Sequence, residues 1–204
     1  MDKYVSYFFK NLNRRMPIKE ALLYTLKALP DHADTLDLYS SIAGARKWEG
    51  WSIRVYDAAL EIEPDNWQIY SIIALELYKA DPQGALDALS KGTAVLLEQD
   101  SQAEDLGWFY QRMAEYLARL GRPRESVAAC RLSMDYPPSE IEDFFLHKAL
   151  ILRADQYLKL GLENLAKRDL VRAVKHNPKD KESLAKLREL SGYEEQLYGG
   201  GAES

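Results

Sequence analysis

The feature that most constrains this chain is a repeated interval between a small residue and a proline. A small residue stands five positions before a proline in three places, Ala59–Pro64, Ser133–Pro138 and Ala173–Pro178. Proline ends a helix because it lacks a backbone N–H, so each interval indicates the end of a helix. Internal repetition of this kind decides the fold, because each copy is one supersecondary unit that must stack on its neighbours.

The copy that ends at Pro178 is the most complete and predicts two helices joined by a turn. Small and large apolar residues recur three or four positions apart on both sides of Gly161, which can adopt the positive φ of a turn. Small residues let the helices approach closely, and large ones fill the space beside them. The copy contains Leu150, Ala154, Tyr157, Gly161, Ala166, Leu170, Ala173 and Pro178. We expect antiparallel helices over 147–160 and 163–177, with Ala154 and Ala166 buried between them.

These residue types at these offsets resemble the tetratricopeptide repeat, a motif of about 34 residues. The copy before Pro138 matches next best, through Tyr110, Met113, Ala114, Leu117, Gly121, Ser126, Cys130 and Ser133. The copy that ends at Pro64 has Lys47 where the turn glycine belongs. The copy that begins near Trp67 degrades, with Ala85, Leu89 and Gly92 one residue out of phase. The resemblance implies an all-α fold, an α-solenoid of helix-turn-helix tetratricopeptide repeats with a C-terminal capping helix.

The repeats suggest four regions along the chain. Residues 1–32 form a divergent helical segment or degenerate repeat, 33–180 the repeat array, 181–198 the capping helix and 199–204 a flexible tail. The capping helix follows from the helical spacing of Leu184, Leu187 and Leu190. Residues 98–105 and 139–143 are insertions relative to an even register, and each of them is either a loop or an extension of the helix that follows.

Composition excludes several classes of function. The net charge of -5 argues against nucleic-acid binding, which needs a basic surface. Cys130 is the single cysteine, so no disulfide within the chain and no Cys-rich metal motif is expected. No stretch of apolar residues is long enough to span a membrane. We expect a cytoplasmic protein, although a processed secreted form would have the same composition.

Residues that would support catalysis are not grouped in the sequence. His32, His147 and His176 lie far apart, and we interpret them as surface or helix-end residues. Cys130 occupies a repeat position that packs between helices, so we expect a buried thiol rather than a reactive one. No phosphate-binding glycine loop, nucleophile elbow or catalytic triad spacing is present. The sequence predicts a protein that is not an enzyme and that needs no metal or cofactor.

The first helices of successive repeats should line a concave groove, which is the expected binding site for a partner protein or peptide. The expected groove residues follow helical spacing offset from the packing positions: Tyr78, Trp108, Gln111, Arg112, Glu115, Lys148, Ile151 and Asp155. The tryptophans either pack at junctions between repeats or, as for Trp108, anchor a partner. We expect Trp67 and Trp108 to open the first helices of their repeats.

Some tetratricopeptide domains hold a chaperone's C-terminal carboxylate with a Lys/Asn/Asn/Lys/Arg clamp. The equivalent positions here carry Asp37, Ser41, Ile72, Trp108 and Arg112, of which only Arg112 fits. The resemblance therefore favours a scaffold or adaptor that does not use this clamp. The alternative is a dedicated chaperone of a secretion system or an assembly factor, which genome neighbourhood would reveal. RNA binding by the basic C-terminal end is a third hypothesis, and salt-sensitive RNA binding would support it.

The N-terminal segment has an amphipathic pattern. Tyr4, Tyr7, Phe8 and Leu12 fall on one helical face. Such a helix either caps the array, makes a homo-oligomer or docks on a partner, or lies weakly on a membrane surface. Acidic residues gather over 31–65 and basic residues over 167–188. These charges are either solvated helix faces or two ends that orient a partner or a second copy.

Overall fold

The computed structural model describes residues 2–30, 34–48, 50–99 and 103–198, and it describes the side chains of these except 103–104 and 191–198. Within this part of the chain every regular element is a helix, which confirms the all-α prediction. The helices gather into two compact units, Met1–Gln99 and Asp100–Ser204. The tail expected over 199–204 and His32 lie outside the described residues.

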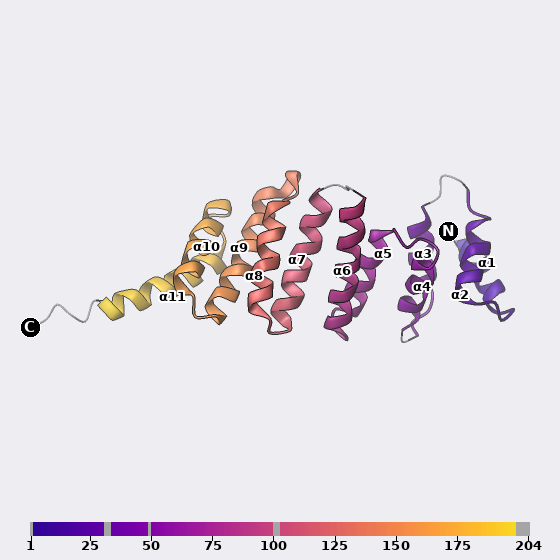
Figure 1. Ribbon diagram of the computed structural model, residues 1–204, viewed down its shortest axis with the longest axis horizontal. Coiled ribbons are helices and arrows are strands. Elements are labelled where there is room, and N and C mark those ends of the chain that lie inside the picture. Colours follow the sequence, from indigo (N-terminus) through magenta and orange to yellow (C-terminus); the bar gives the residue numbers. More distant parts are fainter. Residues whose placement is uncertain (1, 31–33, 49, 100–102, 199–204) are drawn as a thin grey trace, which may run out of the picture. The chain divides into compact units, whose positions relative to one another are not determined.

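The first unit consists of three successive helical hairpins, drawn from indigo to magenta (Figure 1). Helices pair as α1 with α2, α3 with α4 and α5 with α6, and α1–α3, α2–α4 and α4–α5 contacts join the pairs in chain order. Their bounds are Asp2–Leu12 (α1), Ile18–Leu26 (α2), Thr35–Gly44 (α3), Trp51–Leu60 (α4), Trp67–Leu77 (α5) and Pro82–Glu98 (α6). Trp67 thus opens α5, as the sequence predicts.

Helix α1 lies on the α3–α4 hairpin through aromatic side chains. Phe8 is fully buried, and the Phe9 ring stacks on Trp51 with a centroid separation of 5.9 Å. The guanidinium of Arg46, which follows α3, lies 4.2 Å from the centroid of the Phe9 ring. Tyr7 remains 39% exposed, so α1 covers the hairpin with only part of the aromatic face that the spacing predicts.

Two departures from the repeat register do not prevent helices from forming in this unit. The left-handed residue between α3 and α4 is Gly50, with φ of 68°, rather than Lys47. The turn is therefore longer than expected and ends directly at α4. Helix α6 forms although its small residues are out of phase, because Asp81 caps its N-terminus and Pro82 occupies its first turn. It buries Ala85, Leu89 and other residues along a continuous face.

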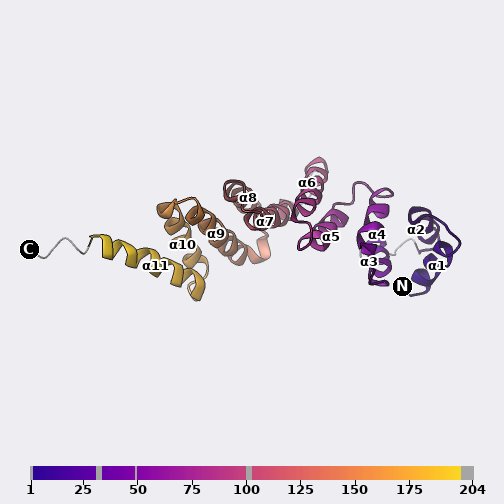
Figure 2. The same ribbon diagram turned by 90° about the horizontal axis from the view of Figure 1, so that it is seen from below.

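The second unit contains two hairpins and a final helix. Helix α7 packs on α8 to form one hairpin, and α9 packs on α10 to form the other. Contacts of α7 and α8 with α9 join the two hairpins, and α11 packs on α10. Figure 2 shows α9, α10 and α11 in orange to yellow, next to one another at this end of the unit. The bounds are Ala103–Arg119 (α7), Pro123–Asp135 (α8), Ser139–Ile141 (a 3-10 turn), Glu142–Lys159 (α9), Glu163–His176 (α10) and Lys181–Tyr198 (α11).

The first helix of each hairpin in this unit ends in the same glycine motif. Gly121 and Gly161 both have φ of 71°, and the backbone N–H of the next residue donates to a carbonyl five positions earlier. For Gly161 this hydrogen bond runs from Leu162 N to Tyr157 O over 2.9 Å. Such a Schellman motif satisfies the last carbonyls of a helix and reverses the chain. It confirms the turn predicted from the sequence at Gly161.

The core of the last hairpin also confirms the predicted packing. Ala154, Ala166 and Leu170 are fully buried together, and Leu187 and Leu190 of α11 pack against them. Helix α11 therefore covers the apolar face that α9 and α10 would otherwise expose to water. This arrangement is how a terminal helix closes a solenoid.

Both insertions end inside the helix that follows, and residues 139–141 of the second one form a 3-10 turn. Helix α7 begins at Ala103 and α9 at Glu142, so the end of each insertion belongs to the helix that follows. One expectation fails for this reason, because Trp108 lies in the second turn of α7 and does not open the helix. The ring of Trp108 packs edge-on against Phe145 of α9, with centroids 5.1 Å apart.

Candidate functional site

The second unit has an open hollow of about 320 Å³ on the side formed by α7, α9 and α11. These are the first helices of the hairpins and the terminal helix, so the hollow lies where the repeat pattern predicts the concave face. The residues that line it are Gln111, Glu115, Phe144, His147, Lys148, Ile151, Leu152, Asp155, Asn177, Asp180 and Glu182.

Five of the eight expected groove residues line this hollow: Gln111, Glu115, Lys148, Ile151 and Asp155. The other three lie elsewhere. Arg112 and Trp108 are on α7 but are not among the lining residues, and Trp108 is 39% exposed and in contact with Phe145. Tyr78 belongs to the first unit, where it follows the last residue of α5. The expected groove residues that line the hollow therefore all belong to the second unit.

Apolar side chains of α9 supply part of the hollow's lining. Phe144 is 53% exposed, and Ile151 and Leu152 are partly exposed about two turns further along the helix. The ammonium of Lys148 lies 5.1 Å from the centroid of the Phe144 ring. An exposed aromatic beside aliphatic side chains is the kind of surface that anchors a partner's apolar residue.

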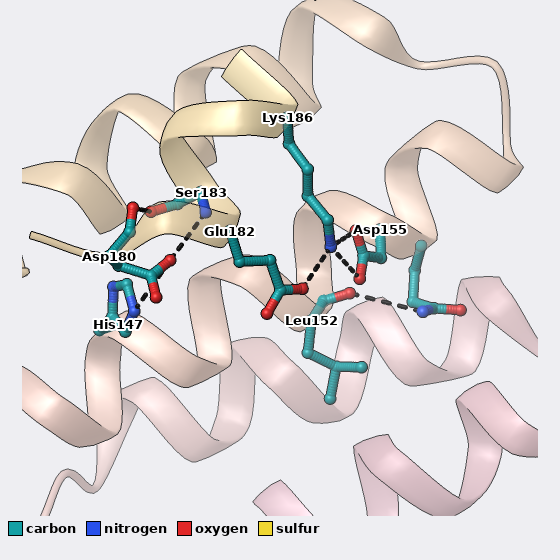
Figure 3. Close-up of polar contacts among 8 residues, drawn as sticks. His147, Leu152, Asp155, Asp180, Glu182, Ser183 and Lys186 are labelled. Carbon is teal, nitrogen blue, oxygen red and sulfur yellow. Dashed lines mark hydrogen bonds and ion pairs between the residues drawn. The ribbon is translucent and has the colours of Figure 1, made fainter. Parts of the chain in front are cut away.

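The start of α11 forms a polar wall of the hollow and is held to α9 by ion pairs. Lys186 Nζ lies 2.6 and 2.8 Å from the two carboxylate oxygens of Asp155 and 2.8 Å from Oε1 of Glu182. Burial lowers the pKa of Lys186, but its hydrogen bonds to Asp155 and Glu182 prevail and raise this pKa above its ordinary value. Figure 3 shows Lys186 between these two carboxylates, with Leu152 nearby on α9.

His147 corrects the expectation that each histidine lies at the surface or at a helix end. It is on the second turn of α9, only 4% exposed, with Nδ1 lying 3.0 Å from the Ala173 carbonyl oxygen. Its Nε2 lies 3.6 Å from Oδ2 of Asp180 (Figure 3). The backbone N–H of Ser183 donates to Asp180 over 2.7 Å and is the main reason that the Asp180 pKa lies below its ordinary value. One aspartate thus caps α11 and contacts α9.

A second polar connection lies behind the hollow, within the last hairpin. Arg153 Nε and Nη2 donate to the two carboxylate oxygens of Asp169 over 2.7 and 2.8 Å. Both residues are buried, at 9% and 4% exposure. This bidentate pair fixes α10 against α9, and with it the helix that carries most of the lining. Burial also raises the pKa of the Cys130 thiol to about 12, which agrees with the prediction of an unreactive cysteine.

Sequence reasoning missed several residues of the hollow. Phe144, Asn177, Asp180 and Glu182 were not predicted to line it, and Lys186 was read only as part of a basic region. Asp180 and Glu182 line the hollow because the start of α11 lies beside α9, where Asp180 contacts His147 and Lys186 pairs with Asp155. A signal was available in the sequence, since Asp180 stands three residues before Ser183 at the expected start of a helix.

The part of the chain that the structure describes contains neither a metal-binding cluster nor a membrane-spanning helix. In this part of the chain no three or more His, Cys, Asp or Glu residues are placed to hold a metal ion. None of its helices combines the length and the apolar character needed to cross a membrane.

The fold is similar to that of two solved structures of the protein MamA. The first matches with a TM-score of 0.60 and 11% sequence identity, over 80% of this chain and 86% of that one. The second has a TM-score of 0.57 and 13% identity, over 82% of this chain and 96% of that one. No family model matches the sequence, and no curated protein matches it. The likeness shows a helical solenoid fold of the tetratricopeptide kind.

Proposed function

We propose that this chain is a divergent tetratricopeptide-type scaffold that binds a segment of another protein in the hollow between α7, α9 and α11. It acts by binding rather than by catalysis, and it works in the cytoplasm. The repeat pattern, the hairpin geometry and the likeness to MamA support the fold on which this proposal rests. Helical repeat arrays use their concave surfaces to bind extended partners.

One observation carries the proposal. Five residues chosen from their spacing on the first helices of the expected repeats, on two different helices, line one open hollow. Its volume of about 320 Å³ accommodates a few side chains of a bound segment. It also combines exposed apolar side chains with charged groups, as small binding sites on proteins do.

Affinity purification with matched variants tests this function. The test variant replaces Phe144 and Ile151 by alanine, because these side chains are on the hollow and are not fully buried. The control variant replaces Leu132 of α8 and Val171 of α10 by alanine, since they are exposed apolar residues away from the hollow. Proteins retained from the source cell are identified by mass spectrometry.

The proposal predicts that at least one protein is retained by the original chain and by the control variant but lost from the test variant. Equal retention by all three chains would show that the hollow is not the binding site. Circular dichroism on each variant establishes that the chain is folded.

A further inference from the structure

The charged groups at the hollow are unequal in number. Four carboxylates line it: those of Glu115, Asp155, Asp180 and Glu182. Among the lining residues the cationic side chain is Lys148, and Lys186 adds a second cation through its contacts with Asp155 and Glu182. Two negative charges therefore remain in excess at the hollow.

The carboxylates differ in how far they are already neutralised. The carboxylate of Asp155 pairs with Lys186 Nζ at 2.6 Å. The carboxylate of Asp180 accepts a hydrogen bond from the backbone N–H of Ser183 and contacts His147. Glu115 is exposed on α7, where its carboxylate accepts a long hydrogen bond of 3.5 Å from the Gln111 amide. Glu115 is thus the carboxylate most available to a ligand from outside. Glu182 shares Lys186 with Asp155, but its side chain is 61% exposed and can also be reached by a ligand.

The lining combines this negative excess with an apolar surface. Phe144 and Ile151 provide that surface on α9. The carboxylate of Glu115 on α7 and that of Glu182 at the start of α11 also line the hollow. A segment that placed an apolar side chain on Phe144 and Ile151 would bring its neighbouring residues close to these carboxylates. Acidic neighbours would be repelled, and basic ones would be attracted.

We propose that the occupant of the hollow is a protein segment in which lysine or arginine stands beside a bulky apolar residue. The apolar residue packs on Phe144 and Ile151, and the cation binds at the carboxylates of Glu115 and Glu182. This inference rests on the proposed function and specifies its partner. It also gives α11 a role beyond covering the last hairpin, because that helix supplies part of the recognition surface.

Peptide selection provides a direct test. A library of random peptides is displayed and selected on the full chain, and the most enriched peptide is synthesised with a fluorescent label. A second version of that peptide carries glutamine in place of each lysine and arginine. Fluorescence anisotropy then gives the Kd of both peptides for the original chain and for a set of variants.

The variants separate charge from shape. Glu115→Gln and Glu182→Gln each remove a negative charge with little change of size, and each should raise the Kd about threefold. Lys148→Gln removes a cation that opposes the ligand and should lower the Kd by a similar factor. Glu189→Gln is the matched control on α11, since this exposed glutamate is not among the lining residues. Added salt should weaken binding of the original peptide.

The outcomes distinguish the inference from the function on which it rests. Enrichment of basic and apolar residues, with opposite effects of Glu115→Gln and Lys148→Gln, supports the inference. Selected peptides that bind equally well without their cations overturn it, while the function stands if Ile151→Ala still weakens them. A library that yields no peptide sensitive to Ile151→Ala or Glu115→Gln overturns both.

Discussion

Replacing Gly107 by alanine tests the contact between α7 and the end of α8. A Cβ atom at Gly107 would overlap the carbonyl oxygen of Tyr136 and lie 3.0 Å from the carbonyl carbon. Both of these atoms belong to the backbone, so no rotation of a side chain relieves the overlap. Helix α7 must therefore move away from Tyr136 by about 1 Å.

The cost follows from the packing around this contact. A gap of that size removes a quarter to a half of the dispersion energy of neighbouring contacts, and overpacking costs about 1–3 kcal/mol. We expect about 3 kcal/mol here, because backbone meets backbone. Alanine favours the helical state over glycine by about 1 kcal/mol, which leaves a net loss of about 2 kcal/mol. The Tm should then fall by roughly 4–8 °C.

Thermal unfolding followed by circular dichroism measures this change. Gly44→Ala is the control, because a Cβ at the end of α3 meets no atom within 4 Å and should leave the Tm unchanged or higher. If Gly107→Ala also leaves the Tm unchanged or higher, α7 does not approach Tyr136 and the packing described for this hairpin is wrong. Gly107→Ala should also weaken peptide binding, because a shift of α7 moves Gln111 and Glu115, which line the hollow from that helix.

Three further predictions follow from buried and terminal residues. Arg153→Met should lower the free energy of unfolding, measured in urea, by about 3–5 kcal/mol, because the Asp169 carboxylate is then buried without its cation. The double variant Arg153→Met, Asp169→Leu should recover most of that loss. The Cys130 thiol should resist a thiol reagent at about pH 8 until the protein is unfolded, because burial raises its pKa to about 12; rapid labelling of the folded chain would contradict its burial. Deletion of residues 1–15 tests the role of α1. If α1 is a cap, the deletion should abolish cooperative unfolding at every protein concentration; if α1 is an interface, it should convert a dimer into a stable monomer in light scattering. No change in either measurement would exclude both roles.

The sequence predicts the fold best where steric constraints act on single residues. Gly161 must adopt a positive φ, and Ala154 and Ala166 must be small where two helices meet, so their positions fix the last hairpin. Prediction is less accurate where caps decide the boundaries. Gly50 rather than Lys47 supplies the turn before α4, because the loop there is longer than the repeat pattern assumes.

The site was partly predictable for a different reason. Helical spacing identifies residues that share a face, and this located Glu115, Ile151 and Asp155 on the hollow. It does not reveal which side chains of different helices meet, such as Lys186 with Asp155 or Arg153 with Asp169. These pairs depend on how α10 and α11 are placed beside α9, and charged residues on a helix are usually solvated.

Site-specific photocrosslinking tests the central claim most directly. A photoreactive phenylalanine derivative replaces Phe144 on the hollow in one chain and Leu132 on α8 in another, and each is irradiated with the partner found by affinity purification. Binding in the hollow between α7, α9 and α11 predicts a crosslinked product from position 144 and none from position 132. Crosslinking from position 132 with none from position 144 would contradict it and place the partner on the opposite helices.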